Sequence, residues 1–186
     1  MKFLFRKKIL SLVLTSVILY SCNMQEQSVA KRLYEQKTYL LSEFQNKSIL
    51  VSRKGNLIVL SYHKDGNLNQ FFFDKGKEDY ILVRDTLQYP INEISAFSSI
   101  NKVDSLHYKY AIVAELKRML KKMDTLNIKG VSAEFASLGI VMKIYLEQNG
   151  ALLYVPNPDV IKDERWKSYV NTAKKYDDNW YYTKDE

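Results

Sequence analysis

The chain has 186 residues, of which 46% are hydrophobic and 13% are aromatic, and it contains only 6 Gly and 3 Pro. This composition can supply the core of one packed domain, and it excludes a largely disordered or low-complexity chain. The formal net charge of +7 falls by 4 to +3 without Lys2, Arg6, Lys7 and Lys8, so the remaining chain is too weakly basic to indicate nucleic-acid binding.

The first 20 residues have the three-part organisation of an export signal. A basic segment ends at Lys8, and an apolar segment covers residues 9–20. This apolar segment is shorter than the roughly 20 residues that a helix needs to span a bilayer, and polar residues follow it from Asn23. We therefore expect a signal peptide rather than a transmembrane helix.

The sequence Leu19-Tyr20-Ser21-Cys22 resembles the lipobox of bacterial lipoproteins, with Leu three residues before the Cys and a small residue directly before it. The resemblance implies that the bond between Ser21 and Cys22 is cleaved, and that Cys22 carries diacylglycerol through a thioether. It covers only the first 22 residues. The alternative interpretation is an ordinary secretory signal followed by a chance cysteine.

A lipid anchor at this position would hold the domain at the cell envelope, because each buried CH₂ contributes about 0.8 kcal/mol to membrane binding. Residue 23 is Asn and not the Asp that resembles an inner-membrane retention signal, so we expect the outer membrane and its periplasmic face. The expected organisation is a signal peptide (1–21), a lipidated Cys with a short tether (22–27) and one domain (28–186).

Helix and strand patterns alternate along this domain. From Ser28, apolar residues at helical spacing predict a helix that ends near residues 46–48. Runs rich in β-branched and aromatic residues then predict four strands, which lie at 49–52, 57–62, 68–73 and 80–83. Asp65-Gly66-Asn67 is a strong hairpin signal, because these residues tolerate positive φ. Residues 85–103, which Pro90 interrupts, remain unassigned.

The second half repeats this alternation. A helix is predicted from Asp104 or Ser105 to about Asp124. Strands are predicted at 131–135, 139–147 and 151–155, with a hairpin turn at Gln148-Asn149-Gly150. Asp159 is predicted to cap a third helix that runs to about residue 175.

The order of these elements predicts an α+β fold. Hairpin turns favour antiparallel pairing over parallel βαβ units. We expect an antiparallel β-sheet built of hairpins or meanders, with about three helices packed on one face, in a single domain.

The chain shows none of the common catalytic motifs: H-E-x-x-H, G-x-S-x-G, a Gly-rich phosphate loop and C-x-x-C are all missing from the sequence. Cys22 is the only cysteine, which excludes an internal disulfide and sites built on paired cysteines. His63 and His107 have no partners at metal-ligand spacing. Asp65-x-Asn67-x-Asn69 lacks the Gly and the Glu that a calcium loop requires. We expect no metal, no cofactor and no enzymatic activity.

Two groups of residues are candidate binding surfaces. Basic residues at helical spacing could meet an acidic partner or anionic lipid, although a solvated face is the simpler interpretation; they are Lys117, Arg118, Lys121 and Lys122. Trp180-Tyr181-Tyr182 does not follow the helical period, so it is either a closing strand or an exposed aromatic patch. If exposed, this patch is the preferred binding surface. By contrast, the helical spacing of Trp166, Tyr169 and Tyr176 predicts core packing.

Three functions remain open at this point. The first is a non-catalytic envelope lipoprotein whose domain binds a protein or a glycan. The second is an inhibitor or immunity lipoprotein directed against an envelope-attacking enzyme, which would need residues 85–103 as a protruding loop. The third is a small hydrolase that uses His63 or His107.

Overall fold

The structure is a computed structural model that describes residues 27–52, 54–99 and 105–184. The predicted lipobox, with Ser21 and Cys22, lies outside these residues. One nine-stranded sheet has the order β4-β3-β2-β1-β5-β6-β7-β9-β8. Its strands are β1 (Lys47–Val51), β2 (Leu57–Lys64), β3 (Asn67–Lys75), β4 (Tyr80–Thr86), β5 (Gly130–Ser132), β6 (Met142–Tyr145), β7 (Gly150–Tyr154), β8 (Lys174–Lys175) and β9 (Trp180–Lys184).

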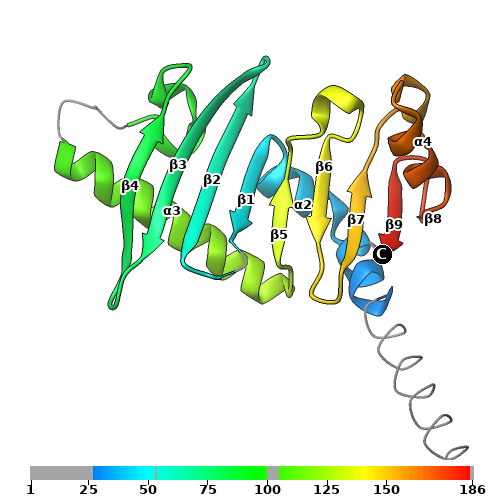
Figure 1. The fold of residues 1–186 in the computed structure, drawn as a ribbon, viewed down its shortest axis with the longest axis horizontal. Helices are drawn as coiled ribbons and strands as arrows, with labels where there is room; N and C mark the ends of the chain where they lie inside the picture. The colour runs from blue at the N-terminus through cyan, green and yellow to red at the C-terminus, as the bar shows by residue number, and fades with distance from the viewer. Residues whose placement is uncertain (1–26, 53, 100–104, 185–186) are drawn as a thin grey trace, which may run out of the picture.

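Every neighbouring pair in this sheet is antiparallel, so the predicted α+β class with an antiparallel sheet is confirmed. Strands β1 to β4 form one meander and β5 to β7 form a second one. The two meanders join where Ile49 of β1 pairs with Val131 of β5. Figure 1 shows the resulting continuous sheet nearly face on.

The predicted hairpin turns are present. Asp65 and Gly66 connect β2 to β3 with φ angles of 50° and 79°, which are the left-handed values that favour these residue types. Asn149, in the turn between β6 and β7, also has a positive φ of 63°. Local turn chemistry therefore sets the register of both hairpins.

The larger core lies on the face of the sheet that is covered by helix α3 (Ser105–Leu126), which we call the α3 face. Buried residues recur along this helix at helical spacing, namely Ile112, Leu116, Met119 and Met123. They form one cluster with Leu60 and Phe71 of the sheet. Figure 1 shows α3 crossing behind β4 to β1. A helical segment (27–35) and α2 (Lys37–Phe44) continue the same layer through Leu33, Leu40 and Phe44.

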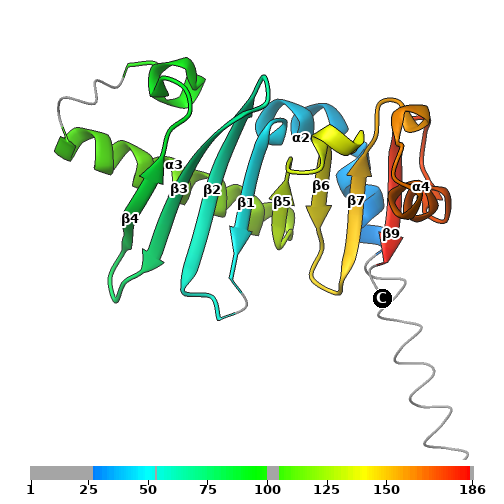
Figure 2. The same ribbon diagram turned by 45° about the horizontal axis from the view of Figure 1, so that its top comes forward.

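Helix α4 (Glu164–Asn171) does not join this layer, so the prediction of about three helices on one face is wrong. Leu152 and Tyr182 pair across β7 and β9 and belong to the α3-face cluster. Their neighbours Leu153 and Tyr181 also pair, but they belong to a second cluster with Val170 of α4. Because successive strand residues point to opposite faces, α4 covers the other face, which we call the α4 face (Figure 2).

The start of α4 also differs from the prediction. Asp163, not Asp159, is the N-cap, and its carboxylate accepts the backbone N–H groups of Arg165 and Trp166 at 3.0 and 3.2 Å. Asp159 lies in a single 3₁₀ turn (Pro158–Val160) that ends before α4 begins. Capping by Asp163 sets where α4 begins and therefore places Trp166 in the first turn of this helix.

The segment between β4 and α3 packs onto the body of the protein. It contains two 3₁₀ turns, Ile91–Glu93 and Ser95–Phe97. Ile91, Ile94 and Phe97 are 6%, 5% and 1% exposed and belong to the α3-face core. Residues 85–99 therefore do not form a protruding loop, and residues 100–103 lie outside the described part of the chain.

Candidate functional site

The aromatic residues at the C-terminus are part of the core and do not form an exposed patch. Trp180, Tyr181 and Tyr182 lie in β9 and are only 2%, 6% and 5% exposed. The strand interpretation therefore holds, and the exposed-patch interpretation fails because β9 is covered on both faces. These three side chains cannot present a binding surface in the folded protein.

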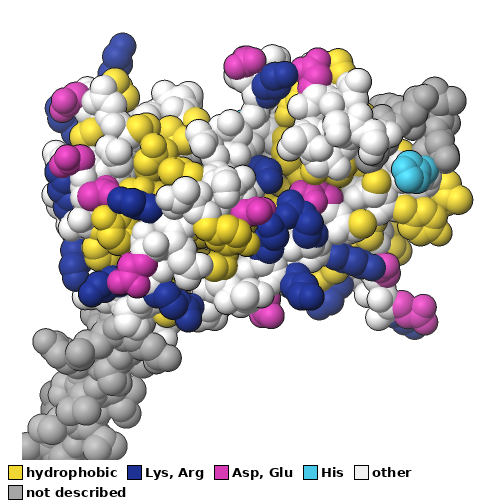
Figure 3. Space-filling view, turned by 180° about the vertical axis from the view of Figure 1, so that it is seen from behind, with side chains coloured by type: hydrophobic (Ala, Val, Ile, Leu, Met, Phe, Trp, Pro, Cys, Tyr) yellow, Lys and Arg dark blue, Asp and Glu magenta, His cyan; other side chains and the backbone are white. Residues whose placement is uncertain are grey.

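The predicted basic surface on α3 is largely paired with carboxylates. Lys117 Nζ lies 2.6 Å from Asp79, and Lys122 Nζ lies 2.5 Å from Glu43. Arg118 contacts both Glu43 and Glu115. On the α3 side of the molecule, basic and acidic side chains are accordingly interspersed (Figure 3). Lys121, the last of the four predicted basic residues, is exposed. It does not change the mixture of positive and negative charges on this surface.

A different cluster of aromatic and basic side chains lies on the α4 face. Lys143 of β6 pairs with Leu153 of β7, which places its side chain on this face. Its Nζ lies 5.0 Å from the ring centroid of Tyr145, 5.0 Å from that of Tyr169 and 5.9 Å from that of Trp166. Three rings thus surround one ammonium at the distance of cation–π contacts.

A hollow of about 390 Å³ lies beside this cluster, and its walls are Lys143, Arg165, Trp166 and Tyr169. We call it the ring hollow. The rings of Trp166 and Tyr169 meet edge to face at 5.4 Å, and Trp166 also contacts Phe135 at 4.7 Å. Although Lys143 is only 6% exposed, it lines the hollow. A rigid aromatic wall beside a cation can hold a ring that carries a negative charge.

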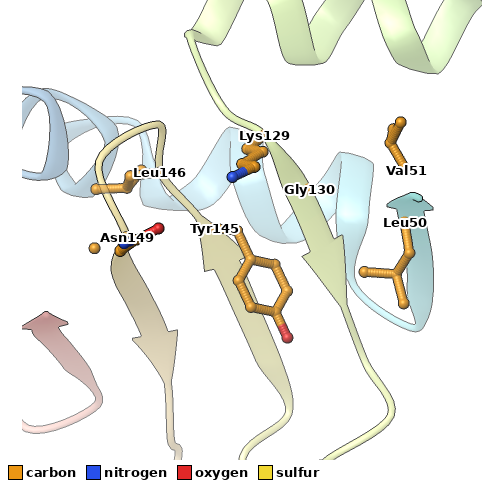
Figure 4. A pocket seen from close by; sticks show the side chains of 8 residues that line it. Leu50, Val51, Lys129, Gly130, Tyr145, Leu146 and Asn149 are labelled. Carbon is orange, nitrogen blue, oxygen red and sulfur yellow. The ribbon is translucent and has the colours of Figure 1, made fainter. Parts of the chain in front are cut away.

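A second hollow of about 200 Å³ is lined by Tyr145 together with Gly130, and we call it the Gly130 hollow. Figure 4 shows Tyr145 on β6 and Leu50 on β1 on either side of Gly130, with Lys129 at the rim. A Cβ at Gly130 would lie 3.4 Å from Tyr145 Cδ2 and 3.1 Å from the Ile49 carbonyl oxygen. The absent side chain at Gly130 therefore allows the ring of Tyr145 to lie close against β5.

A third hollow, of about 660 Å³, is lined by His63 near the C-terminal end of β2. His63 Nε2 lies 3.0 Å from Ser48 Oγ, and burial lowers the pKa of His63 below its usual 6.5. Ser48 is completely buried, and its oxygen accepts the Ala133 N–H at 2.9 Å. Because Ser48 does not line the hollow, this Ser–His contact ties β1 to β2 and does not present a nucleophile to a substrate.

His107, the second histidine considered for catalysis, is exposed on the first turns of α3. No group of three His, Cys, Asp or Glu side chains in the described residues could hold a metal ion. Within the same ranges, no helix has the length and apolar character required to cross a membrane.

The sequence identified only part of this site. Helical spacing correctly predicted that Trp166 and Tyr169 pack against the core, since both contact the cluster under α4. It did not indicate that they also line a hollow with Lys143. The available signal was Lys143, a charged residue inside the apolar strand Met142–Tyr145. Lysine is rarely fully buried unless its charge interacts with a partner.

Comparison with known proteins gives no relative: no protein family, no curated protein and no solved structure matches the chain.

Proposed function

We propose that this protein is a lipoprotein of the bacterial cell envelope whose domain is a non-catalytic binding module for a glycan. The ring hollow is its binding site. The observation that supports this proposal is the position of Lys143 among the rings of Tyr145, Trp166 and Tyr169, beside an open hollow of about 390 Å³.

The chemistry of the hollow favours a sugar over a flat protein surface. Sugar rings present apolar C–H faces that stack on aromatic side chains, and their hydroxyl or carboxylate oxygens accept hydrogen bonds from lysine and arginine. Concave sites lined by aromatics with a few polar groups are typical of small-ligand recognition. The long segment that an inhibitor would need is packed on the core, through Ile91, Ile94 and Phe97, so the glycan hypothesis is preferred.

The test is saccharide binding by the full-length protein, purified from membranes in detergent. Calorimetric titration with galacturonic acid, N-acetylmuramic acid, N-acetylglucosamine and glucose should show saturable binding of at least one sugar. Trp166→Ala and Lys143→Met should each weaken that binding at least tenfold, because truncation of a central aromatic or charged anchor costs more than about 1.4 kcal/mol. Tyr110→Ala is the matched control, since Tyr110 is 68% exposed on α3, away from this face. Saturable binding that both site variants retain would disprove the proposed site.

The membrane anchor is a separate part of the proposal and rests on Leu19-Tyr20-Ser21-Cys22 alone. We infer that Cys22 becomes the lipidated N-terminus and holds the domain at the outer membrane, on its periplasmic face. Intact-mass analysis of the native protein should show the loss of residues 1–21 and the added mass of a diacylglyceryl group. Cys22→Ala should abolish both changes and release the protein from washed membranes. An unchanged lipid mass in Cys22→Ala would contradict the anchor.

A further inference from the structure

The ring hollow and the Gly130 hollow each have one lining residue on β6, Lys143 and Tyr145. Tyr145 contributes to the Gly130 hollow, and its ring lies 5.0 Å from Lys143 Nζ, which lines the ring hollow. Lys143 and Tyr145 are two residues apart on β6, so their side chains lie on one face about 6–7 Å apart along the strand. This spacing is on the scale of one sugar ring. The two hollows are therefore adjacent positions on one surface.

Basic side chains line both hollows. Lys143 and Arg165 line the ring hollow, and Lys129 lines the Gly130 hollow. Neither hollow is lined by Asp or Glu, in contrast to the His63 hollow, which Asp65 and Glu134 line. Three cations and three aromatic rings thus line the two hollows, and Arg165 also pairs with Asp163 at 3.6 Å.

Gly130 has a specific role in this arrangement. A Cβ at Gly130 would lie 3.1 Å from the Ile49 carbonyl oxygen and 3.4 Å from Tyr145 Cδ2, and Leu50 lies on the other side of Gly130 (Figure 4). Because β5 contributes no side chain at this point, the ring of Tyr145 lies close to the sheet backbone, where a ligand can stack on it. A single sugar can occupy the ring hollow alone, and only a longer ligand would also reach the Gly130 hollow.

We propose that the ligand is an acidic oligosaccharide of at least two units, which extends from the ring hollow over Tyr145 into the Gly130 hollow. Its carboxylates are bound by Lys143, Arg165 and Lys129, and its sugar rings stack on Trp166, Tyr169 and Tyr145. This inference rests on the proposed glycan-binding function and adds the charge and the length of the glycan.

The test compares galacturonic acid with its hexamer, and the hexamer with neutral β-1,4-linked galactohexaose, on the full-length protein in detergent. We expect the acidic hexamer to bind at least tenfold tighter than the monomer and the neutral hexamer. Its affinity should fall with added salt, because ionic contacts are screened. Lys129→Glu should weaken hexamer binding at least fivefold and leave monomer binding within twofold. Lys121→Glu is the matched control, since Lys121 is an exposed lysine of α3, and it should change neither affinity.

Each contrary result has a distinct meaning. Equal affinity for the acidic and neutral hexamers would overturn the acidic class and leave glycan binding standing. Equal affinity for the acidic monomer and hexamer, or no effect of Lys129→Glu on the hexamer, would overturn the extended site. Tighter binding of hexaglutamate than of hexagalacturonate, with the same dependence on Lys129, would replace the saccharide by an acidic peptide. Failure of every saccharide to bind would disprove the proposed function itself.

Discussion

The hydroxyl group of Tyr62 donates a 3.0 Å hydrogen bond to Glu115 Oε1 and thereby joins β2 to α3 inside the protein. Glu115 is 7% exposed and also accepts two hydrogen bonds from Arg118, at 2.6 and 2.7 Å. Burial, together with the adjacent carboxylate, raises the pKa of Tyr62, so the phenol remains a donor. A buried carboxylate needs all of these donors, since an unsatisfied charge is costly.

Tyr62→Phe should therefore destabilise the protein by about 2 kcal/mol, because it removes one donor from a buried carboxylate without changing the volume of the ring. Urea unfolding monitored by circular dichroism measures this change. Tyr110→Phe serves as the control: Tyr110 is 68% exposed, and its loss should cost less than about 0.5 kcal/mol. Equal effects of the two substitutions would refute the role of the Tyr62–Glu115 contact.

Glu43 links α2 to α3 through ion pairs with Lys122 at 2.5 Å and Arg118 at 3.1 Å. The hydrogen bond from Lys122 lowers the pKa of Glu43 below its usual value. The stabilisation that these ion pairs provide is thus complete at pH values above the pKa of Glu43 in the unfolded chain. It is lost as the pH falls through the pKa of Glu43 in the folded protein. Glu43→Gln should cost about 0.5–1 kcal/mol at pH 7.

Unfolding at neutral and acidic pH checks this prediction. The difference between Glu43→Gln and the unaltered protein should shrink at acidic pH, where Glu43 is itself protonated. The control is Glu35→Gln, which changes an exposed carboxylate of the first helical segment and should have no measurable effect at either pH. A pH-independent difference for Glu43→Gln would show that its contribution is not ionic.

His63 should make the stability depend on pH below about 6.5, its pKa in the unfolded chain. Burial lowers its pKa in the folded state, and the charge of Glu134 opposes this effect. The unfolded chain therefore binds more protons than the folded protein, so stability should fall as the pH drops below the unfolded-state value of about 6.5. His63→Gln should flatten this slope in chemical unfolding curves, and His107→Gln should retain it. An unchanged slope in His63→Gln would assign the effect to other groups.

The two tryptophans should respond in opposite ways. Trp180 is 2% exposed in the core of the α3 face, so Trp180→Ala should cost about 3–5 kcal/mol of stability and leave the affinity of the remaining folded protein for sugar unchanged. Trp166→Ala should cost less stability, because Trp166 is only partly buried, but it should weaken sugar binding at least tenfold. Calorimetric titration and urea unfolding of both variants distinguish the two roles.

Phe97 tests whether the segment after β4 is part of the core. Its side chain is 1% exposed and meets the rings of Tyr62 and Phe71 edge to face, at 5.7 and 5.9 Å. Phe97→Ala should lower the unfolding free energy by about 3–5 kcal/mol. Val83→Ala, at a residue that is 52% exposed, should change it by less than about 0.5 kcal/mol. A small effect of Phe97→Ala would restore the protruding-loop interpretation.

The features that depend on adjacent residues were predictable from the sequence. Positive φ at Asp65 and Gly66 follows from their residue types, and so does the hairpin that they close. The helical spacing of Ile112, Leu116 and Met123 similarly predicted α3 and its buried side. Capping was less certain, because Asp159 and Asp163 are chemically equivalent and only the adjacent 3₁₀ turn decides between them.

The two faces of the sheet were not predictable. Leu152 and Leu153 are both completely buried, so the β6–β9 half of the sheet gives no alternation that would distinguish one face from the other. For the same reason, Trp180, Tyr181 and Tyr182 read equally well as a buried strand or as an exposed patch.

The sequence by itself determined the local elements, the antiparallel hairpins and the expectation of a lipid anchor at Cys22, because each depends on residues next to one another in the chain. Only the tertiary structure decided that α4 folds onto the face opposite α3, and this packing brings Trp166 and Tyr169 to Lys143. The three residues come together because Val170 of α4 is buried in one cluster with Leu153 and Tyr181, and Leu153 pairs with Lys143 of β6. That burial is a contact between distant segments, which no local pattern encodes.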